Sequence, residues 1–160
     1  MSRRVPGIVK RGFTLVEILI VVVILGILAA IVVPQFASAS DDARVSAFAT
    51  SILSMDRAIR LYQGKYAEYP GDPSSGDLPA GLDEFIAAED YENGTPLGGV
   101  WDIEVEYGGI TGTRCLVGAA EGAIAIDDDL MLRVDAVIDD GVDSTGAFQQ
   151  SGTRYYWVVR

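Results

Sequence analysis

A single carboxylate lies inside a long apolar run near the start of the chain. Residues 11–34 read RGFTLVEILIVVVILGILAAIVVP, and Glu17 is the only ionisable side chain between Arg11 and Asp41. A charged acid costs roughly 2.5–3.5 kcal/mol at the centre of a membrane helix, and less near the end where Glu17 lies. An acid kept inside such a run is a functional candidate, because pairing with a cation lowers that cost.

Oxygen-bearing side chains form two acidic clusters later in the chain. The first is the run 127–129, and the second contains Asp139, Asp140, Asp143 and Thr145. Calcium takes six to eight oxygen ligands, and close aspartates in a loop supply them, so the second cluster is a candidate calcium site. It lacks the glycine and the terminal glutamate of an EF-hand loop. The alternative interpretation is a helix N-cap at the first cluster and an Asp-Gly turn at the second.

Missing residue types exclude several kinds of chemistry. The chain has no histidine, which removes Ser-His and Cys-His catalysis and the zinc sites built with histidine. Cys115 is the only cysteine, so no intramolecular disulfide can form, and the apolar residues after it favour a buried strand cysteine over a reactive thiol. Paired carboxylates also occur in glycosidases, but nothing else supports that reaction. We therefore expect no enzymatic activity and no cofactor other than calcium.

Charge is distributed very unevenly along the chain. Four of the 12 basic residues precede the apolar run, and 22 of the 23 acidic residues follow it, which leaves a net charge of −14 after Pro34. Nucleic-acid binding requires a basic face, and anionic lipid attracts basic segments, so the acidic part is expected to bind neither. The acidity favours the solubility of an exported domain.

The apolar run is long enough to cross a membrane as a helix. Residues 13–33 supply 21 positions, enough for about 30 Å of hydrocarbon. Basic residues precede the run without any acid, so the N-terminus is expected to stay cytoplasmic. Two alternatives are a secretory signal peptide cleaved near Ala37-Ser38-Ala39 and an uncleaved anchor in which Glu17 is incidental.

The helical pattern continues beyond the membrane segment but becomes amphipathic. Apolar residues recur at a spacing of seven in two series, namely Val45, Ile52 and Ile59, and Phe48, Met55 and Tyr62. Such a stripe is typical of a helix that packs on a core. Pro34 removes a hydrogen bond and clashes with the preceding turn, so we expect a kink or a boundary there. If the helix only bends, it runs from Phe13 to about Gln63.

The rest of the chain predicts a small antiparallel sheet. In order, the pattern predicts a loop over 65–80, a short helix over 80–89, a strand over 101–107, a hairpin into 114–119, a short strand over 122–126, and a closing hairpin of 147–150 with 153–160. The segment 127–140 fits both a strand and a helix, and the N-cap at Asp127 with the stop at Gly141 favours the helix. The expected fold is α+β, with the sheet packed on the amphipathic half of the long helix.

Aromatic residues gather in the last strand of this sheet. Alternation places Tyr155 and Trp157 on one face and Tyr156 on the other. The run is either an aromatic binding surface or ordinary sheet packing, and packing is favoured.

The start of the chain resembles the prepilin signal of type IV pilins and type II secretion pseudopilins. Lys10-Arg11 precede Gly12-Phe13-Thr14-Leu15-Val16-Glu17, and the match extends to residue 35. The resemblance implies cleavage between Gly12 and Phe13 by a prepilin peptidase, N-methylation of Phe13, an assembly role for Glu17, and the helix proline of the family at Pro34. It divides the chain into a leader (1–12), a membrane helix (13–34) and an exported pilin-like domain (35–160).

The resemblance also implies a function and a set of partners. The chain is expected to be a structural subunit that polymerises with copies of itself and with other pilins or pseudopilins, on a bacterial inner-membrane platform and in contact with lipid. Many type IV pilins carry a C-terminal disulfide, which a single cysteine cannot form within the chain, so the lone cysteine favours a type II secretion pseudopilin. Major pseudopilins also often bind calcium. A type IV pilus subunit is the alternative within the family. A membrane-anchored calcium- or ligand-binding domain that never polymerises is the alternative of another class.

Overall fold

The computed structural model describes residues 12–104, 116–119, 127–152 and 154–159. The chain divides into two compact units, Met1–Ala39 and Ser40–Arg160. Helix α1, Leu15–Tyr66, contributes to both. The expected hairpin into 114–119, the expected strand over 122–126 and Cys115 lie wholly or partly outside the described residues.

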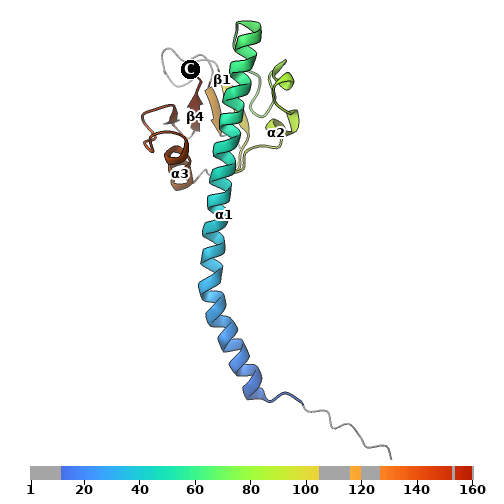
Figure 1. The fold of residues 1–160 in the computed structure, drawn as a ribbon, viewed down its shortest axis with the longest axis vertical. Helices are drawn as coiled ribbons and strands as arrows, with labels where there is room; N and C mark the ends of the chain where they lie inside the picture. The colour runs from blue at the N-terminus through green and yellow to red at the C-terminus, as the bar shows by residue number, and fades with distance from the viewer. Residues whose placement is uncertain (1–11, 105–115, 120–126, 153, 160) are drawn as a thin grey trace, which may run out of the picture. The chain divides into compact units, whose positions relative to one another are not determined.

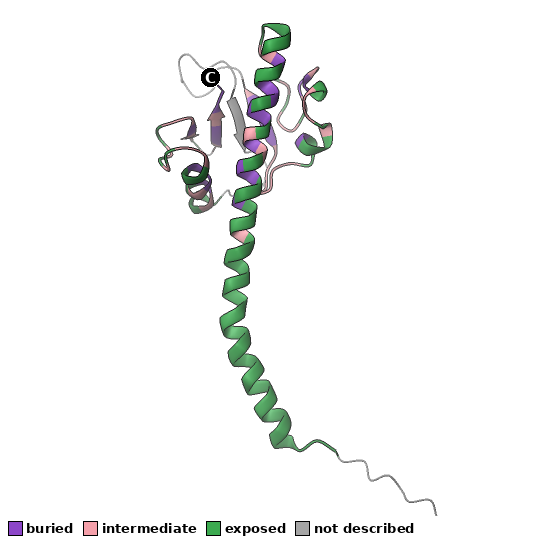
Figure 2. Ribbon diagram, in the orientation of Figure 1, coloured by how far each residue is buried: buried purple, intermediate pink, exposed green. Residues whose placement is uncertain are grey.

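The N-terminal half of α1 buries nothing within the chain. Every residue from 12 to 40 is exposed (green in Figure 2), and the helix is the one in the described part of the chain that is long and apolar enough to cross a membrane. A helix that is apolar all round belongs in lipid or in a large core. Pro34 lies inside α1, so it is not a helix boundary; the kink remains a prediction.

The C-terminal half of α1 supplies one side of the core. All six members of the two expected apolar series are buried, as Figure 2 shows in purple along this half. The stripe predicted from the sequence is therefore confirmed. Asp56 lies beside it and is also buried, because its carboxylate accepts hydrogen bonds from Trp157 Nε1 at 3.1 Å and from Arg60 Nε at 2.7 Å.

The segment after α1 differs from the single helix expected over 80–89. The structure has a 3₁₀ turn η1, Leu82–Glu84, and a separate helix α2, Ala88–Glu92. Ala87 is extended, with φ −66° and ψ 132°, which breaks the helical path. Leu82 and Tyr91 are both buried. Their packing in the core therefore prevents the continuous helix that the local spacing of apolar residues predicted.

In the part of the chain that the structure describes, four short antiparallel strands form the sheet. They are β1 Trp101–Glu104, β2 Leu116–Ala119, β3 Phe148–Ser151 and β4 Arg154–Val158, in the order β1-β2-β4-β3. The closing hairpin is confirmed, with Phe148 opposite Trp157. The C-terminal half of α1 lies across the sheet (Figure 1), and the Phe48 ring stacks on Trp101 with centroids 5.1 Å apart. The expected α+β pilin-like fold is confirmed.

Helix α3, Asp128–Ile138, connects β2 to β3 and resolves the ambiguity of that segment. Asp127 caps it, because its Oδ1 accepts a hydrogen bond from the Asp129 backbone N–H at 3.0 Å. The helix buries Met131, Val134 and Asp135. The sequence preference for helix over strand is confirmed, and the reason is the cap together with the 3.6-residue spacing of the buried side chains.

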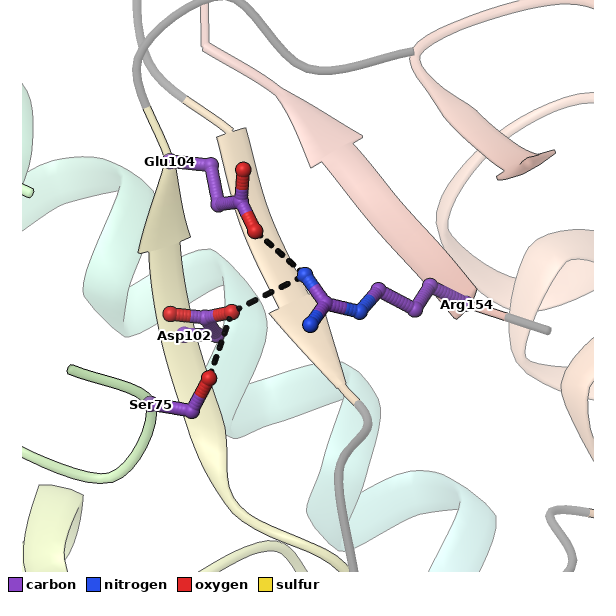
Figure 3. A network of polar contacts seen from close by, with 4 residues as sticks. All are labelled: Ser75, Asp102, Glu104 and Arg154. Carbon is purple, nitrogen blue, oxygen red and sulfur yellow. Dashed lines mark hydrogen bonds and ion pairs between the residues drawn. The ribbon is translucent and has the colours of Figure 1, made fainter. Parts of the chain in front are cut away.

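A polar network ties β4 to β1 on the sheet (Figure 3). The Arg154 side chain reaches across the intervening β2 to pair with Asp102, at 3.2 Å, and with Glu104. Ser75 Oγ donates to the same Asp102 oxygen at 3.0 Å. Burial raises the pKa of Glu104, and the neighbouring Asp102 adds to this, while Arg154 opposes it.

Replacing Arg154 with alanine is expected to destabilise the domain by about 2 kcal/mol at neutral pH, because Asp102 is buried and loses its cation. Arg154 lowers the pKa of Glu104, so without Arg154 that pKa rises further, and the loss is largest at neutral pH and shrinks as acid protonates Glu104. Chemical denaturation from pH 4 to 8 measures this. A loss that does not depend on pH would contradict the electrostatic explanation.

Candidate functional site

Glu17 and Thr14 together cap the N-terminal end of α1. The Glu17 Oε2 atom accepts hydrogen bonds from the Thr14 backbone N–H and from Thr14 Oγ1, each at 2.8 Å. In return, Thr14 Oγ1 accepts from the Glu17 backbone N–H at 3.2 Å. This is a reciprocal capping box with the acid at the third helical position. The carboxylate is thereby fixed in one orientation at the end of the helix.

The predicted scissile bond lies just before this cap. Gly12 and Phe13 are outside α1 and exposed, as a bond that a peptidase cuts must be. No atom of a described residue beyond the two chain neighbours lies within 4 Å of the position of a Cβ on Gly12. Cleavage there would leave the Phe13 amine one residue from the Thr14 N–H that holds Glu17. The cleavage, methylation and assembly roles remain predictions.

Thr14 is the hydrogen-bond partner of the candidate residue Glu17, and the sequence analysis named it only as part of the motif. The available signal was the spacing T-x-x-E before an apolar run, which is the sequence signature of a capping box. Recognising it would have predicted that Glu17 is held within its own helix end.

A second candidate site lies where α3 ends. Oxygen atoms of Asp135, Asp139 and Asp140 lie within 4.8 Å of one another. Asp135 is fully buried, and neither of its carboxylate oxygens makes a hydrogen bond in good geometry with a described residue. Burial raises the pKa of Asp135; the nearby Gly141 N–H lowers it in part, and the surrounding aspartates raise it further.

The loop after α3 organises the other two members of this cluster. Asp139 Oδ2 accepts from the backbone N–H groups of Ala147 and Phe148, the latter at 2.8 Å, at the start of β3. Asp140 accepts from the Val142 N–H at 2.9 Å and from Thr145 Oγ1 at 2.7 Å. These bonds hold the loop in the shape that brings the carboxylates together.

Four residues were predicted from the sequence for the calcium site, and the structure places them differently. Asp139 and Asp140 are in the cluster, whereas Thr145 contacts it through Asp140 and Asp143 is not one of its three members. Asp135 was missed. It follows Met131 and Val134 on the buried face of α3, so an acid at a core position of a helical stripe was the signal that could have found it.

The cluster has the chemistry of a hard-cation site. It offers carboxylate oxygens close together, and a buried carboxylate without partners is costly unless a cation or a proton neutralises it.

The first acidic cluster, residues 127–129, has a structural role. Asp127 caps α3, and Asp128 accepts a hydrogen bond from the Tyr155 hydroxyl at 2.9 Å. The aromatic run of β4 packs in the sheet, since Tyr155 and Tyr156 are buried.

Gly146 makes the close approach of Asp139 possible. Its φ of +76° is in the left-handed region, and a Cβ there would lie 2.0 Å from Asp139 Oδ2. Gly146→Ala is expected to destabilise the domain by about 1–3 kcal/mol, from backbone strain and displacement of the carboxylate. Thermal unfolding measures the loss. Gly152→Ala is the control, because its φ of +64° carries the backbone strain but no atom lies within 4 Å; equal losses would contradict the role of the clash.

Comparison with known proteins supports the interpretation of the N-terminal site. Residues 9–33 match the family model of the prokaryotic N-terminal methylation motif. The chain is similar to the type II secretion system core protein G of Pseudomonas aeruginosa, with 49% identity over 61 residues, 38% of this chain and 43% of the relative. The resemblance found in the sequence is thereby confirmed.

Two further relatives extend the similarity beyond the motif. The core protein G of Klebsiella pneumoniae is 31% identical over 93 residues, 56% of this chain and 62% of the relative. A fimbrial protein of Neisseria meningitidis is 28% identical over 88 residues, 53% of this chain and 52% of the relative. The chain spans less than two thirds of the length of these relatives. No solved structure matches it. The apolar helix and these relatives indicate a membrane-anchored protein, and neither relative's name denotes an enzyme.

Proposed function

We propose that this chain is a structural subunit of a type II secretion pseudopilus. The observation that carries the proposal is the methylation motif, in which an exposed Gly12–Phe13 bond precedes a helix start closed by Glu17. In this proposal a prepilin peptidase removes residues 1–12 and methylates Phe13. The mature helices then pack side by side into a filament that drives protein secretion.

The electrostatics of Glu17 give the assembly step its physical basis. A carboxylate that enters hydrocarbon without a cation is costly, and the new Phe13 amine of a neighbouring copy supplies one. The capping box keeps the carboxylate at the helix end, next to where each copy carries its own amine. Glu17 then sets the register between copies.

The remaining partners follow from this mechanism. The N-terminus lies on the cytoplasmic side of the bacterial inner membrane, where basic residues are retained, and the domain after residue 34 is exported. Assembly requires the peptidase, an inner-membrane platform, and other pilins or pseudopilins. A type IV pilus subunit is the second candidate, favoured by the fimbrial relative; the secretion role is favoured by the core protein G relatives and by the lone cysteine.

Calcium binding at the end of α3 is proposed as a structural feature of the same subunit. Asp135, Asp139 and Asp140 would hold the ion, and backbone or water oxygens would complete its shell. The buried carboxylate of Asp135, which makes no hydrogen bond in good geometry with a described residue, supports the fit. When bound, calcium neutralises this carboxylate and ties α3 to the loop that leads into β3.

The proposed function is tested by the mass and sequence of the mature N-terminal peptide from native membranes. A peptide that begins at Phe13 and carries one extra methyl group is the expected result. A start near Ser40 would indicate a secreted soluble domain, and a start at Met1 an uncleaved anchor that does not polymerise; either outcome would overturn the proposal.

A further inference from the structure

The two edges of the described sheet are protected in different ways. Edge strand β1 carries the charged residues Asp102 and Glu104. A loop outside the sheet also covers it, because the Gly76 N–H donates to the Trp101 carbonyl at 2.8 Å. Edge strand β3, Phe148–Ser151, carries no charged residue and no proline. Charge and proline are common means by which an edge strand avoids pairing with another chain, so β3 depends on protection from elsewhere in the fold.

The hydrogen bonds between β3 and β4 establish which backbone groups of β3 point away from the sheet. The Val158 N–H donates to the Ala147 carbonyl at 2.7 Å, just before β3 begins. Bonded and non-bonded positions alternate along an antiparallel ladder. Gln149 therefore directs its backbone groups toward β4, whereas Phe148 and Gln150 direct theirs outward.

The loop that follows α3 occupies both outward N–H groups of β3. The Phe148 N–H donates to Asp139 Oδ2 at 2.8 Å, and the Gln150 N–H donates to the Asp143 carbonyl at 2.7 Å. We call residues 139–146 the strap. While the strap is closed, these two donors are not available to another strand.

Polar contacts rather than core packing hold the strap in place. None of residues 139–146 is buried, and the one large apolar side chain among them, Val142, is 46% exposed. Segments with few buried apolar contacts open at a lower free energy than the core does. The strap can therefore open while the sheet and α1 stay packed.

We infer that the strap is an autoinhibitory cover, and that the edge beneath it binds β3 of a second copy. A strand edge is complementary to itself, because each outward residue offers one donor and one acceptor. With Phe148 of each copy opposite Gln150 of the other, every outward N–H meets a carbonyl, and the two Gln149 residues lie opposite each other. The edge is uncharged, whereas the chain after residue 34 carries a net charge of −14 that repels other surfaces of a second copy.

Pairing through β3 is incompatible with the parallel packing of the proposed filament. The two-fold axis of such an antiparallel pair is perpendicular to the sheet, and the C-terminal half of α1 lies across the sheet (Figure 1). The axis therefore reverses the direction of this half of α1 in the second copy. A closed strap keeps the exported domain available for parallel packing. This consequence rests on the proposed function, whereas the pairing itself does not.

Disulfide trapping in full-length chains tests the pairing and its register. In the inferred pair, the Cα atoms of the two Gln149→Cys residues lie about 4.5 Å apart, which a disulfide spans. Gln150→Cys is the matched control, because Gln150 is equally half-buried but lies on a diagonal of about 7–8 Å, which a disulfide does not span. All chains carry Cys115→Ser. They are oxidised with diamide in detergent and EDTA, so that no metal ion contributes.

Opening the strap is expected to allow the pairing. Asp139→Ala removes the acceptor of the Phe148 N–H, and Gly146→Ala displaces the same carboxylate. Each is expected to raise the disulfide-linked fraction of the Gln149→Cys chain about fivefold, while the Gln150→Cys chain stays at its low level. Asp143→Ala is the control, because its bond to β3 comes from its backbone carbonyl, which the substitution leaves in place.

Two outcomes of this experiment would overturn the inference. A chain that unfolds or aggregates when the strap is altered would form disulfides through both cysteine positions alike. A strap that does not guard β3 would leave the Gln149→Cys chain unlinked in every variant. The subunit role is tested separately by the mass of the mature N-terminal peptide of the unmodified chain, so either proposal can fail without the other.

Discussion

Replacing Glu17 with valine is expected to leave membrane insertion intact and to abolish incorporation into filaments. Insertion becomes easier, because the only charge in the apolar run is removed. Assembly fails, because the Phe13 amine of the neighbouring copy then enters lipid without its anion. Losing one member of a buried ion pair costs about 3–5 kcal/mol, so the sedimentable fraction should fall at least about 100-fold.

Two matched variants separate charge from helix capping. Glu17→Gln removes the charge but keeps a side chain that fits the capping box, so it should fail like valine. Thr14→Val keeps the charge and removes the hydroxyl partner of Glu17, so it should assemble, with a frayed first turn and a smaller loss. Sedimentation of sheared filaments and carbonate extraction of membranes measure assembly and insertion. Filaments of normal yield from Glu17→Val would contradict the pairing mechanism.

The long helix and its buried stripe could be predicted from the sequence because both depend on local spacing. The two apolar series at seven-residue intervals fixed which face of α1 meets the sheet, and all six residues are buried. The effect of Pro34 on the helix could not be predicted in the same way. A proline inside a helix either ends it or lets it continue, and α1 continues.

The segments that were predicted wrongly are those whose structure depends on contacts between residues far apart in the sequence. The spacing of Leu82, Phe85 and Ile86 fits a helix, but the buried anchors Leu82 and Tyr91 divide the segment into η1 and α2. The pairing of Arg154 with Asp102 joins strands that are not neighbours in the sheet, so no periodicity along the chain reveals it.

At the acidic candidate site, too, the features that depend on neighbouring residues could be predicted, and those that depend on packing could not. The Asp-Gly turn chemistry around Asp140 was visible in the sequence, and the Asp140 carboxylate does bond within its own loop. Asp135 is brought to the loop by the packing of α3, because Met131 and Val134 on the same face are buried. The sequence therefore indicated the loop as a candidate site, while the fold determined which carboxylates lie close to one another.

Calcium is expected to raise the melting temperature of the exported domain through Asp135, Asp139 and Asp140. At a free concentration 100 times the dissociation constant, binding adds about 2.7 kcal/mol of stability, roughly 10 °C for a domain of this size. Thermal unfolding of the full chain in detergent, with EDTA or with calcium, measures the shift. Equal melting temperatures in the two conditions would contradict the site.

Asp135→Asn distinguishes this site from a diffuse attraction of calcium to an acidic surface. The amide has the shape of the carboxylate without its charge, so the variant should be at least as stable as the parent in EDTA, because a buried unpaired charge is gone. It should lose the response to calcium. Asp143→Asn removes the same charge outside the cluster and should keep most of the response. Equal responses from the two variants would mean that calcium acts on the net charge of the domain, and that the burial of Asp135 has another cause.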